Sequence, residues 1–390
     1  MARKKILWLC SWYPGKTEPF NGDFIQRHAR AAALENDIYV IHVIGDTTGK
    51  VAAIEKEIQQ FAGLTEHIVY FKKGTSLPGR IKAHLRWQFL FRQAIRKYMV
   101  GNGKPDMVHV HIPYKAGMLG LWLKKKYKLP YIVSEHWGIY NNVEVLNYAG
   151  RSSRFKRFTE KVFQQASSCI SVSRYLADGV NEQVVKRDFT IIQNTVDISL
   201  FQFREKPATE FSFIHVSNMV PLKNAEGILR AFKLLVDKGL SAKLLMAGNP
   251  TDVMSNYAIT IGLSTASVQF VGEVPYSQVA ALMQSAHCLV VNSNIENSPC
   301  VIGEALCCGL PVIATRVGGI PELADNGNSI LITPGNDMEL TNAMQQMMEN
   351  YAVYDKKKIA ENAQGKFSYP VIGKKFDAVY QEVCSANKKS

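Results

Sequence analysis

The sequence lacks any hydrophobic run long enough to cross a membrane, since no stretch approaches the ~18 consecutive apolar residues of a spanning helix. It also lacks a C-x-x-C pair, and its seven cysteines are scattered and odd in number. This usage argues against a disulfide framework and favours a reducing compartment such as the cytoplasm. Cys307 and Cys308 lie in an apolar run before Gly309, where we expect them to pack as small hydrophobic side chains.

A signal peptide is not expected at the N-terminus. Arg3, Lys4 and Lys5 precede an apolar run at residues 6–10, but the run is short and no small-residue cleavage site follows. Pro14 and Gly15 end it as a turn ends a buried strand. We therefore interpret residues 6–10 as a first β-strand.

The composition is that of an ordinary globular protein with two domains. The chain has 390 residues, of which 47% are hydrophobic and 20% charged, and domains hold roughly 100 to 200 residues each. The net charge of +13 is unevenly distributed. Residues 1–200 hold 30 Lys and Arg against 16 Asp and Glu, whereas the remainder holds 16 against 17. The asymmetry indicates an anionic partner for the first half: nucleic acid, an acidic membrane or an anionic substrate.

Short apolar runs alternate with amphipathic stretches, which is typical of βα units. Strands are expected at residues 6–10, 38–44, 107–112, 131–134, 170–173 and 189–193, and again at 211–217, 242–247, 268–271, 287–292 and 311–314. Between these sets, residues 194–210 are polar and read as a hinge. We predict an α/β protein with two Rossmann-like, doubly wound parallel-sheet domains facing a central cleft. The expected bounds are 1–200, 201–370 and a C-terminal helix at 371–390 that packs back on the first domain.

The segment from Glu296 to Glu304 carries the clearest chemical signal. Ser298 is expected to cap a helix that has Pro299 at its first position, and Gly309 and Pro311 give the matching stop. The start of such a helix is an anion site for a diphosphate. The two carboxylates flanking it can accept hydrogen bonds from hydroxyl groups on either side.

This run resembles the E-x7-E element of the retaining family 4 glycosyltransferases, which have the GT-B fold. The resemblance continues through Ala305–Thr315 and Gly318–Glu322. The hinge-entry motif of that family resembles residues 193–197, and its strand-then-lysine motif resembles residues 216–224. In the first half, residues 108–113 and 134–138 match its two histidine-bearing strand ends.

The resemblance implies an enzyme that transfers a hexosyl or pentosyl group, with retention, from a nucleotide-diphosphate sugar to a saccharide or lipid-linked acceptor. It implies that Glu304 holds the donor ribose, Glu296 the transferred sugar and Lys223 the diphosphate. His136 would lie beside the transferred sugar. The remaining donor-binding positions would be Gly22, Asn218, Gly272, Asn297, Ser298, Pro299 and Cys300.

Two positions depart from the family pattern. Asn218 stands where members commonly have arginine, so a bidentate phosphate clamp is lost. Arg316 and Arg27 are the candidate replacements. Thr195 stands where glycine is usual in the hinge motif.

We expect no metal and no cofactor beyond the nucleotide-sugar. The sequence has no D-x-D motif of a cation-binding glycosyltransferase. His109 and His111 lie on one face of their strand, but no third ligand has suggestive spacing, so strand-end packing or hydrogen bonding explains them better.

Two clusters mix basic and aromatic residues in the first half. One runs from Arg80 to Tyr98 and the other from Arg151 to Lys161. Either they dock on anionic lipid at the inner face of the cytoplasmic membrane, or they are helices that pack against the core and expose a basic face to solvent. The docking hypothesis would bring the enzyme to a lipid-linked acceptor in cell-envelope or exported polysaccharide synthesis.

Three other functions fit parts of the sequence. A nucleotide-sugar epimerase can share the two-domain architecture. A dinucleotide oxidoreductase would need a G-x-G-x-x-G after its first strand, where this chain has Trp12-Tyr-Pro-Gly-Lys16. The basic half could bind nucleic acid, but no reader motif accompanies the charge, so no nucleic-acid partner is expected.

Overall fold

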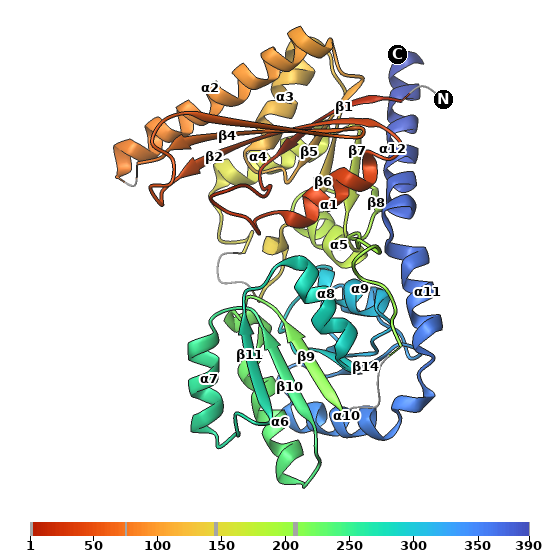
Figure 1. Ribbon diagram of the computed structural model, residues 1–390. Helices are drawn as coiled ribbons and strands as arrows, with labels where there is room; N and C mark the ends of the chain where they lie inside the picture. Colours follow the sequence, from red (N-terminus) through yellow and green to blue (C-terminus); the bar gives the residue numbers. More distant parts are fainter. Residues whose placement is uncertain (1–2, 75, 144–146, 206–209, 390) are drawn as a thin grey trace. The chain divides into compact units, whose positions relative to one another are not determined.

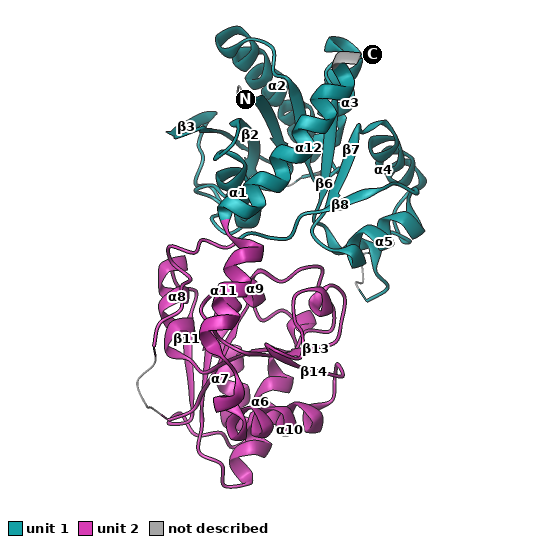
Figure 2. Ribbon diagram, turned by 90° about the vertical axis from the view of Figure 1, so that its right-hand side faces the viewer, with its two compact units in different colours: residues 1–195, 369–390 teal, residues 196–368 magenta. Residues whose placement is uncertain are grey.

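The computed structural model describes residues 3–74, 76–143, 147–205 and 210–389. The chain forms two compact units (Figure 2). Unit 1 comprises residues 1–195 and 369–390, and unit 2 comprises residues 196–368. Within the described part of the chain, no helix is both long enough and apolar enough to span a membrane.

Unit 1 is built around an eight-stranded sheet with the order β3-β4-β2-β1-β5-β6-β7-β8 (Figure 1). All neighbouring strands are parallel except β3 and β4, which form an antiparallel pair. Its elements are β1 (Lys5–Cys10), α1 (Asp23–Ala32), β2 (Asp37–Asp46), β3 (Glu55–Phe61), β4 (Leu64–Lys72), α2 (Leu77–Asn102), β5 (Met107–His111), α3 (Ala116–Tyr127), β6 (Tyr131–Glu135), α4 (Ser153–Gln165), β7 (Ser168–Ser171), α5 (Arg174–Gln183), β8 (Phe189–Ile191) and α12 (Tyr369–Lys389).

Both faces of the unit 1 sheet are buried, and alternate residues of β1 supply the two cores. Leu7 and Leu9 pack with side chains from α2, α3, α4 and α5. Ile6, Trp8 and Cys10 pack on the opposite face with side chains from α1 and α12. A parallel strand covered on both faces is mostly apolar, which explains the hydrophobic run at residues 6–10 of β1.

Unit 2 contains a six-stranded parallel sheet with the order β11-β10-β9-β12-β13-β14. Helices α8, α9 and α11 contribute to the core on one face, and α6, α7 and α10 to the core on the other. Its elements are β9 (Ser212–Val216), α6 (Ala225–Asp237), β10 (Lys243–Ala247), α7 (Thr251–Thr260), β11 (Val268–Gly272), α8 (Tyr276–Ser285), β12 (Cys288–Val291), α9 (Cys300–Cys307), β13 (Val312–Thr315), β14 (Ser329–Ile332), α10 (Asp337–Glu349) and α11 (Lys356–Phe367).

The predicted pair of doubly wound α/β domains is confirmed, but three strands were not predicted. Strand β3 is mostly exposed and polar, so it shows neither an apolar run nor a clean alternation. Strand β4 lies between β2 and β3 and carries the buried polar residues Glu66 and His67. Strand β14 has only four residues at the edge of its sheet. Edge strands and polar strands carry weak sequence signals because burial on two faces does not dictate their composition.

The last helix belongs to unit 1 although unit 2 precedes it in the chain. Helix α12 packs against α1, and Gly373 allows the close approach, since a Cβ there would lie 2.3 Å from the carbonyl oxygen of Ala31. Lys4 and Asp377 form an ion pair of 3.1 Å. The chain passes from unit 1 to unit 2 after Thr195 and returns at Tyr369, whereas the sequence placed the changes at residues 200 and 370.

Gly373→Ala should therefore lower the free energy of unfolding of unit 1 by roughly 1–3 kcal/mol, as overpacking does. Gly101→Ala is the matched control, because Gly101 lies in α2 with no atom within 4 Å of its Cβ position; this change should add up to about 1 kcal/mol. Urea unfolding followed by tryptophan fluorescence measures both, since all five tryptophans lie in unit 1. Equal effects of the two changes would contradict the packing described for α12.

Candidate functional site

The strand order of unit 2 reverses at β9, and an ion pair lies at this reversal. From β9 the chain adds β10 and β11 on one side and then β12 on the other, so the loops after β9 and β12 diverge at the carboxyl ends of their strands. Ligands of open α/β sheets bind in such a crevice. Lys223 follows β9 and Glu296 follows β12, and Lys223 Nζ donates a hydrogen bond of 2.5 Å to Glu296 Oε1.

The Glu296 loop is held in one conformation by its neighbours. Ser293 Oγ donates to Glu296 Oε1 at 2.8 Å, and Thr315 Oγ1 donates to the Ser293 carbonyl at 2.6 Å. Gly319 N donates to the Glu296 carbonyl at 3.0 Å. At Gly318, φ is +53° and a Cβ would lie 1.8 Å from the Glu296 carbonyl oxygen, so only glycine fits.

Glu304 lies inside α9 and is only 2% exposed. Its Oε1 accepts a hydrogen bond of 2.5 Å from the Tyr276 hydroxyl at the start of α8. Glu296 thus lies on the loop and Glu304 inside the helix, as the sequence predicted.

The expected cap of this helix is wrong in detail. Pro299 occupies the N-cap position with φ −67° and ψ 121°, no side chain caps the helix, and the first helical residue is Cys300. Asn297 and Ser298 come before it in the loop, and Ser298 is buried. Proline at the N-cap moves the helix start one residue later than a Ser298 cap would place it.

The loop after β9 carries Asn218 and follows a tight backbone path. Met219 has a φ of +47° and donates its N–H to Ser217 Oγ at 2.9 Å. Gly248 follows β10 and lies so close to this loop that a Cβ on it would be 1.8 Å from the Ser217 carbonyl oxygen. Gly248 N donates to the carbonyl of Gly272, at the end of β11, at 2.7 Å. Asn218 itself is exposed.

Two of the predicted site residues, Gly22 and His136, belong to unit 1. Gly22 has a φ of +75° before α1, and a Cβ there would lie 2.8 Å from backbone atoms of Trp12 and Tyr13. The glycine is therefore required by the packing of its own loop. Of the two arginines considered as replacements for the missing clamp, Arg27 is buried in unit 1 and pairs with Asp23 at 3.0 Å, whereas Arg316 is exposed after β13.

His136 lies in a buried cluster of histidine imidazole rings. Its Nε2 is 3.4 Å from His111 Nδ1, and its ring lies 5.6 Å from that of His28. Burial lowers the pKa of His136 well below its usual value, and the neighbouring His28 and His109 lower it further. The pKa of His28 is lowered to about 4 by burial. The cluster is therefore uncharged at neutral pH.

Glu135 fixes the loop that presents His136. One carboxylate oxygen accepts from the backbone N–H groups of His136 and Trp137 at 2.8 and 2.9 Å, and the other accepts from the Tyr140 hydroxyl at 2.7 Å. Burial raises the pKa of Glu135 to about 7, although these three hydrogen bonds oppose the shift.

The histidines of β5 have packing and hydrogen-bonding roles. His109 hydrogen-bonds to the Tyr380 hydroxyl and to Ser134 Oγ, at 2.8 and 2.7 Å. Among the described residues no three His, Cys, Asp or Glu side chains are grouped as metal ligands.

Several residues that shape the site did not stand out in the sequence for this purpose. Ser293, Tyr276 and Gly248 support the site of unit 2, and Glu135 supports His136 in unit 1, all from positions near strand or helix ends. The one sequence signal that could have found any of them is a polar residue shortly after a buried strand, such as Ser293 after β12. The contacts of Tyr276 and Gly248 join segments that are distant in sequence, so no local pattern reveals them.

The fold defines an α/β protein with two Rossmann-like units, each with a reversal of strand order in its sheet. One family model, "Glycosyltransferase Family 4", matches residues 25–200, and a second, "Glycosyl transferases group 1", matches residues 197–366. The chain belongs to these glycosyltransferases and has the GT-B fold. The family assignment favours glycosyl transfer over the epimerase, oxidoreductase and nucleic-acid-binding alternatives.

Related proteins cover nearly the whole chain. The putative teichuronic acid biosynthesis glycosyltransferase TuaC of Bacillus subtilis is 24% identical over 96% of this chain and 95% of its own length. The sucrose-phosphate synthase of Thermosynechococcus elongatus is structurally similar, with a TM-score of 0.76, 18% identity and coverage of 98% and 100% of the two chains. HepE of Anabaena in complex with UDP gives a TM-score of 0.72 at 19% identity, over 97% and 100%.

Gly318→Ala should displace the Glu296 loop and reduce the affinity for a nucleotide-sugar at least ten-fold. Gly335→Ala is the matched control, since Gly335 also has a positive φ, +74°, but no atom within 4 Å of its Cβ position. Both variants carry the cost of a left-handed alanine, about 1–2 kcal/mol, so their difference isolates the clash with Glu296. Calorimetric titration with nucleotide-sugars measures it; equal affinities of the two variants would argue against this role for Gly318.

Proposed function

We propose that this glycosyltransferase binds a nucleotide-diphosphate sugar at the β9–β12 crevice of unit 2 and transfers its hexosyl or pentosyl group with retention. The acceptor is a saccharide or a lipid-linked saccharide. The proposal rests on the Lys223–Glu296 ion pair. This pair lies where the strand order of unit 2 reverses, and Glu296 comes just before the start of α9.

The chemical step separates a sugar from a diphosphate, so negative charge grows on the leaving group. The bond from the anomeric carbon to the diphosphate oxygen breaks, a bond to the acceptor hydroxyl oxygen forms, and the hydroxyl proton passes to the departing diphosphate. Lys223 and the backbone N–H groups at the start of α9 stabilise that charge. Asn297, Ser298, Pro299 and Cys300 line the approach to this helix start, and no step is assigned to a metal.

The two glutamates serve binding rather than acid–base chemistry. Glu296 already accepts from Lys223 and Ser293 and offers its second oxygen to hydroxyl groups of the transferred sugar. Glu304 is buried beside Tyr276 and accepts from the ribose. We assign Asn218 and Gly272 to the nucleotide, Gly22 of unit 1 to the phosphates and His136 of unit 1 to the transferred sugar. Because its imidazole is neutral, His136 accepts or donates a hydrogen bond without adding charge.

The cellular role that fits best is cell-envelope or exported polysaccharide synthesis in the cytoplasm. The similarity to TuaC along 96% of the chain supports this role, and HepE, which has a similar fold, binds UDP.

Lys223→Met should reduce kcat/KM by at least 100-fold, which corresponds to roughly 2.7 kcal/mol of lost charge stabilisation. Lys233→Met is the control, because Lys233 forms an ion pair with Asp237 on the exposed side of α6. Thermal-shift screening against uridine, guanosine and adenosine diphosphate sugars identifies the donor first, and transfer is then measured with it. A Lys223→Met enzyme within two-fold of the wild type would refute the assignment of the diphosphate to this lysine.

We further propose that α2 docks unit 1 on an anionic membrane surface, where a lipid-linked acceptor resides. The predicted aromatic cluster divides in two in the structure: Trp87, Leu90, Phe91 and Tyr98 are core residues. Ile81, Leu85 and Phe89 are instead 60%, 61% and 62% exposed. They are spaced four residues apart and so form one apolar stripe along the helix.

The charge beside this stripe favours acidic lipid as its partner. Helix α2 contains no acidic residue in 26 positions but six basic ones. Lys82, Arg86 and Arg96 are exposed, and each cation near an acidic bilayer contributes about 1 kcal/mol. An apolar stripe flanked by cations is the pattern of an interfacial helix.

Replacing Ile81, Leu85 and Phe89 with serine should reduce binding to vesicles of phosphatidylglycerol and phosphatidylcholine at least ten-fold. The control replaces the exposed Val253 and Ile259 of α7 in unit 2 with serine and should leave vesicle binding unchanged. Co-sedimentation at low and high salt measures both. If the wild type does not bind the vesicles at low salt, the docking proposal is wrong.

A further inference from the structure

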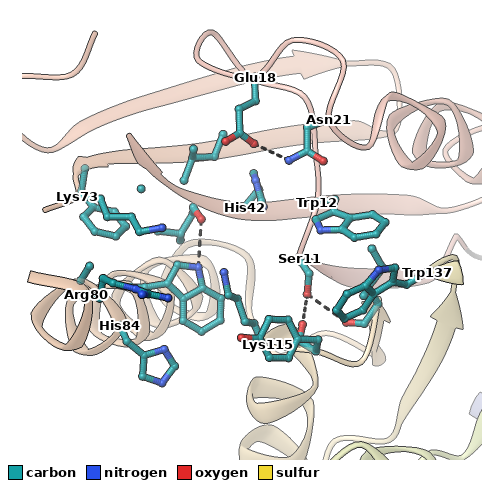
Figure 3. Close-up of a pocket in the computed structure, with 18 residues that line it drawn as sticks. Ser11, Trp12, Glu18, Asn21, His42, Lys73, Arg80, His84, Lys115 and Trp137 are labelled. Carbon is teal, nitrogen blue, oxygen red and sulfur yellow. Dashed lines mark hydrogen bonds between the residues drawn. The ribbon is translucent and has the colours of Figure 1, made fainter. Parts of the chain in front are cut away.

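Unit 1 contains a cavity of about 530 Å³ at the carboxyl ends of five strands (Figure 3). Its wall includes Trp12 after β1, Gly45 near the end of β2, Lys73 after β4, Ile112 after β5 and Trp137 after β6. Arg80, His84 and Trp87 close it from α2. The strand order of this sheet reverses at β1, so the cavity lies where open α/β sheets bind ligands, and its volume is within the roughly 300–1,000 Å³ typical of such sites.

The cavity is strongly cationic. Lys73, Arg80 and Lys115 line it, and Glu18 is the one carboxylate in its wall. Glu18 accepts from Asn21 Nδ2 at 2.5 Å. Among the described residues, none of the three cations has a carboxylate within the 4.0 Å of an ion pair. Three like charges facing one concave surface repel each other unless an anion lies between them.

Lys115 is held in the cavity wall at a conformational cost. Its φ is +65° and that of Ile112, in the same loop, is +66°, which is unfavourable for residues with a Cβ. Ser11 secures this loop: its single Oγ–H is shared between the carbonyl oxygens of Ile112 and Tyr114, and its Oγ accepts from Ala116 N. Although the side chain of Lys115 reaches solvent, the surrounding protein removes part of its hydration and Lys73 repels its charge, so its pKa is lowered. A bound anion would attract the charge of Lys115 and so raise its pKa again.

The opposite side of the cavity is aromatic. In Figure 3, Lys73 and Arg80 lie on the left and Trp12 and Trp137 on the right. The two indoles are half-buried, with ring centroids 6.0 Å apart. Indole faces pack against the C–H faces of sugar rings, whereas the cations at the other side suit a negatively charged substituent. The cavity thus combines a surface for a sugar ring with a surface for an anion.

We propose that the acceptor saccharide carries an anionic group, a phosphate or a carboxylate, that Lys73, Arg80 and Lys115 bind in this cavity. The acceptor role rests on the proposed function of the chain as a transferase using a nucleotide-sugar. The anion preference rests on the three cations alone.

Calorimetric titration with glucose 6-phosphate, glucuronate and glucose tests the proposal, since these probes share a ring and differ in charge. Wild-type protein should bind at least one of the two anionic sugars ten-fold or more tightly than glucose. A preference for glucose 6-phosphate assigns the group as phosphate, and one for glucuronate assigns it as carboxylate. Lys73→Met and Lys115→Met should each remove most of this preference.

Lys72→Met is the matched control: Lys72 ends β4 beside Lys73, is exposed and is absent from the cavity wall. It should retain the preference for the anionic sugar. The proposal is overturned if glucose binds as tightly as both anions, or if Lys72→Met loses as much as Lys73→Met, because general attraction by a basic surface would then suffice. Failure of the proposed function would appear separately, as absence of nucleotide-sugar binding by the wild type, which these titrations do not involve.

Discussion

The reversal of strand order at one central strand in each sheet is the constraint on which both candidate sites depend. From β1, and likewise from β9, the chain adds strands first on one side of that strand and later on the other. Because helices pack on both faces of each sheet, the carboxyl ends of the strands are the places where side chains can meet a ligand. Lys223 and Glu296 meet beside β9, and the cationic cavity forms around β1.

At the β9 crevice, glycines allow the backbone approach on which the charged side chains depend. Gly318 touches the Glu296 carbonyl, and Gly248 touches that of Ser217. These contacts bring loops from four strands together, and Lys223 and Ser293 order the carboxylate of Glu296. Such preorganisation lowers the cost of ordering the site during the reaction.

The sequence predicted most of the fold because both sheets are buried, and burial on two faces requires apolar runs such as residues 6–10. It failed for β3, whose exposed polar residues follow no such requirement. That Glu296 and Lys223 follow strands and that Glu304 lies inside a helix could be predicted from a recognisable local motif. Tyr276, Gly248 and the cavity wall could not, since each depends on tertiary contacts between distant segments. The cap of α9 was misplaced because serine and proline compete for neighbouring positions at a helix start.

The uneven charge of the chain has a structural explanation that composition alone does not give. Most of the excess cations lie in unit 1, and α2 contributes cations to two distinct surfaces. Arg80 and His84 face the cavity, whereas Lys82 and Arg86 accompany the exposed stripe of Ile81, Leu85 and Phe89. The buried face of α2, which includes Trp87 and Phe91, fixes these two surfaces relative to one another. On the two proposals made above, an acidic membrane surface and an anionic acceptor would be recognised by the same rigid element, and the absence of acidic residues from α2 is consistent with both.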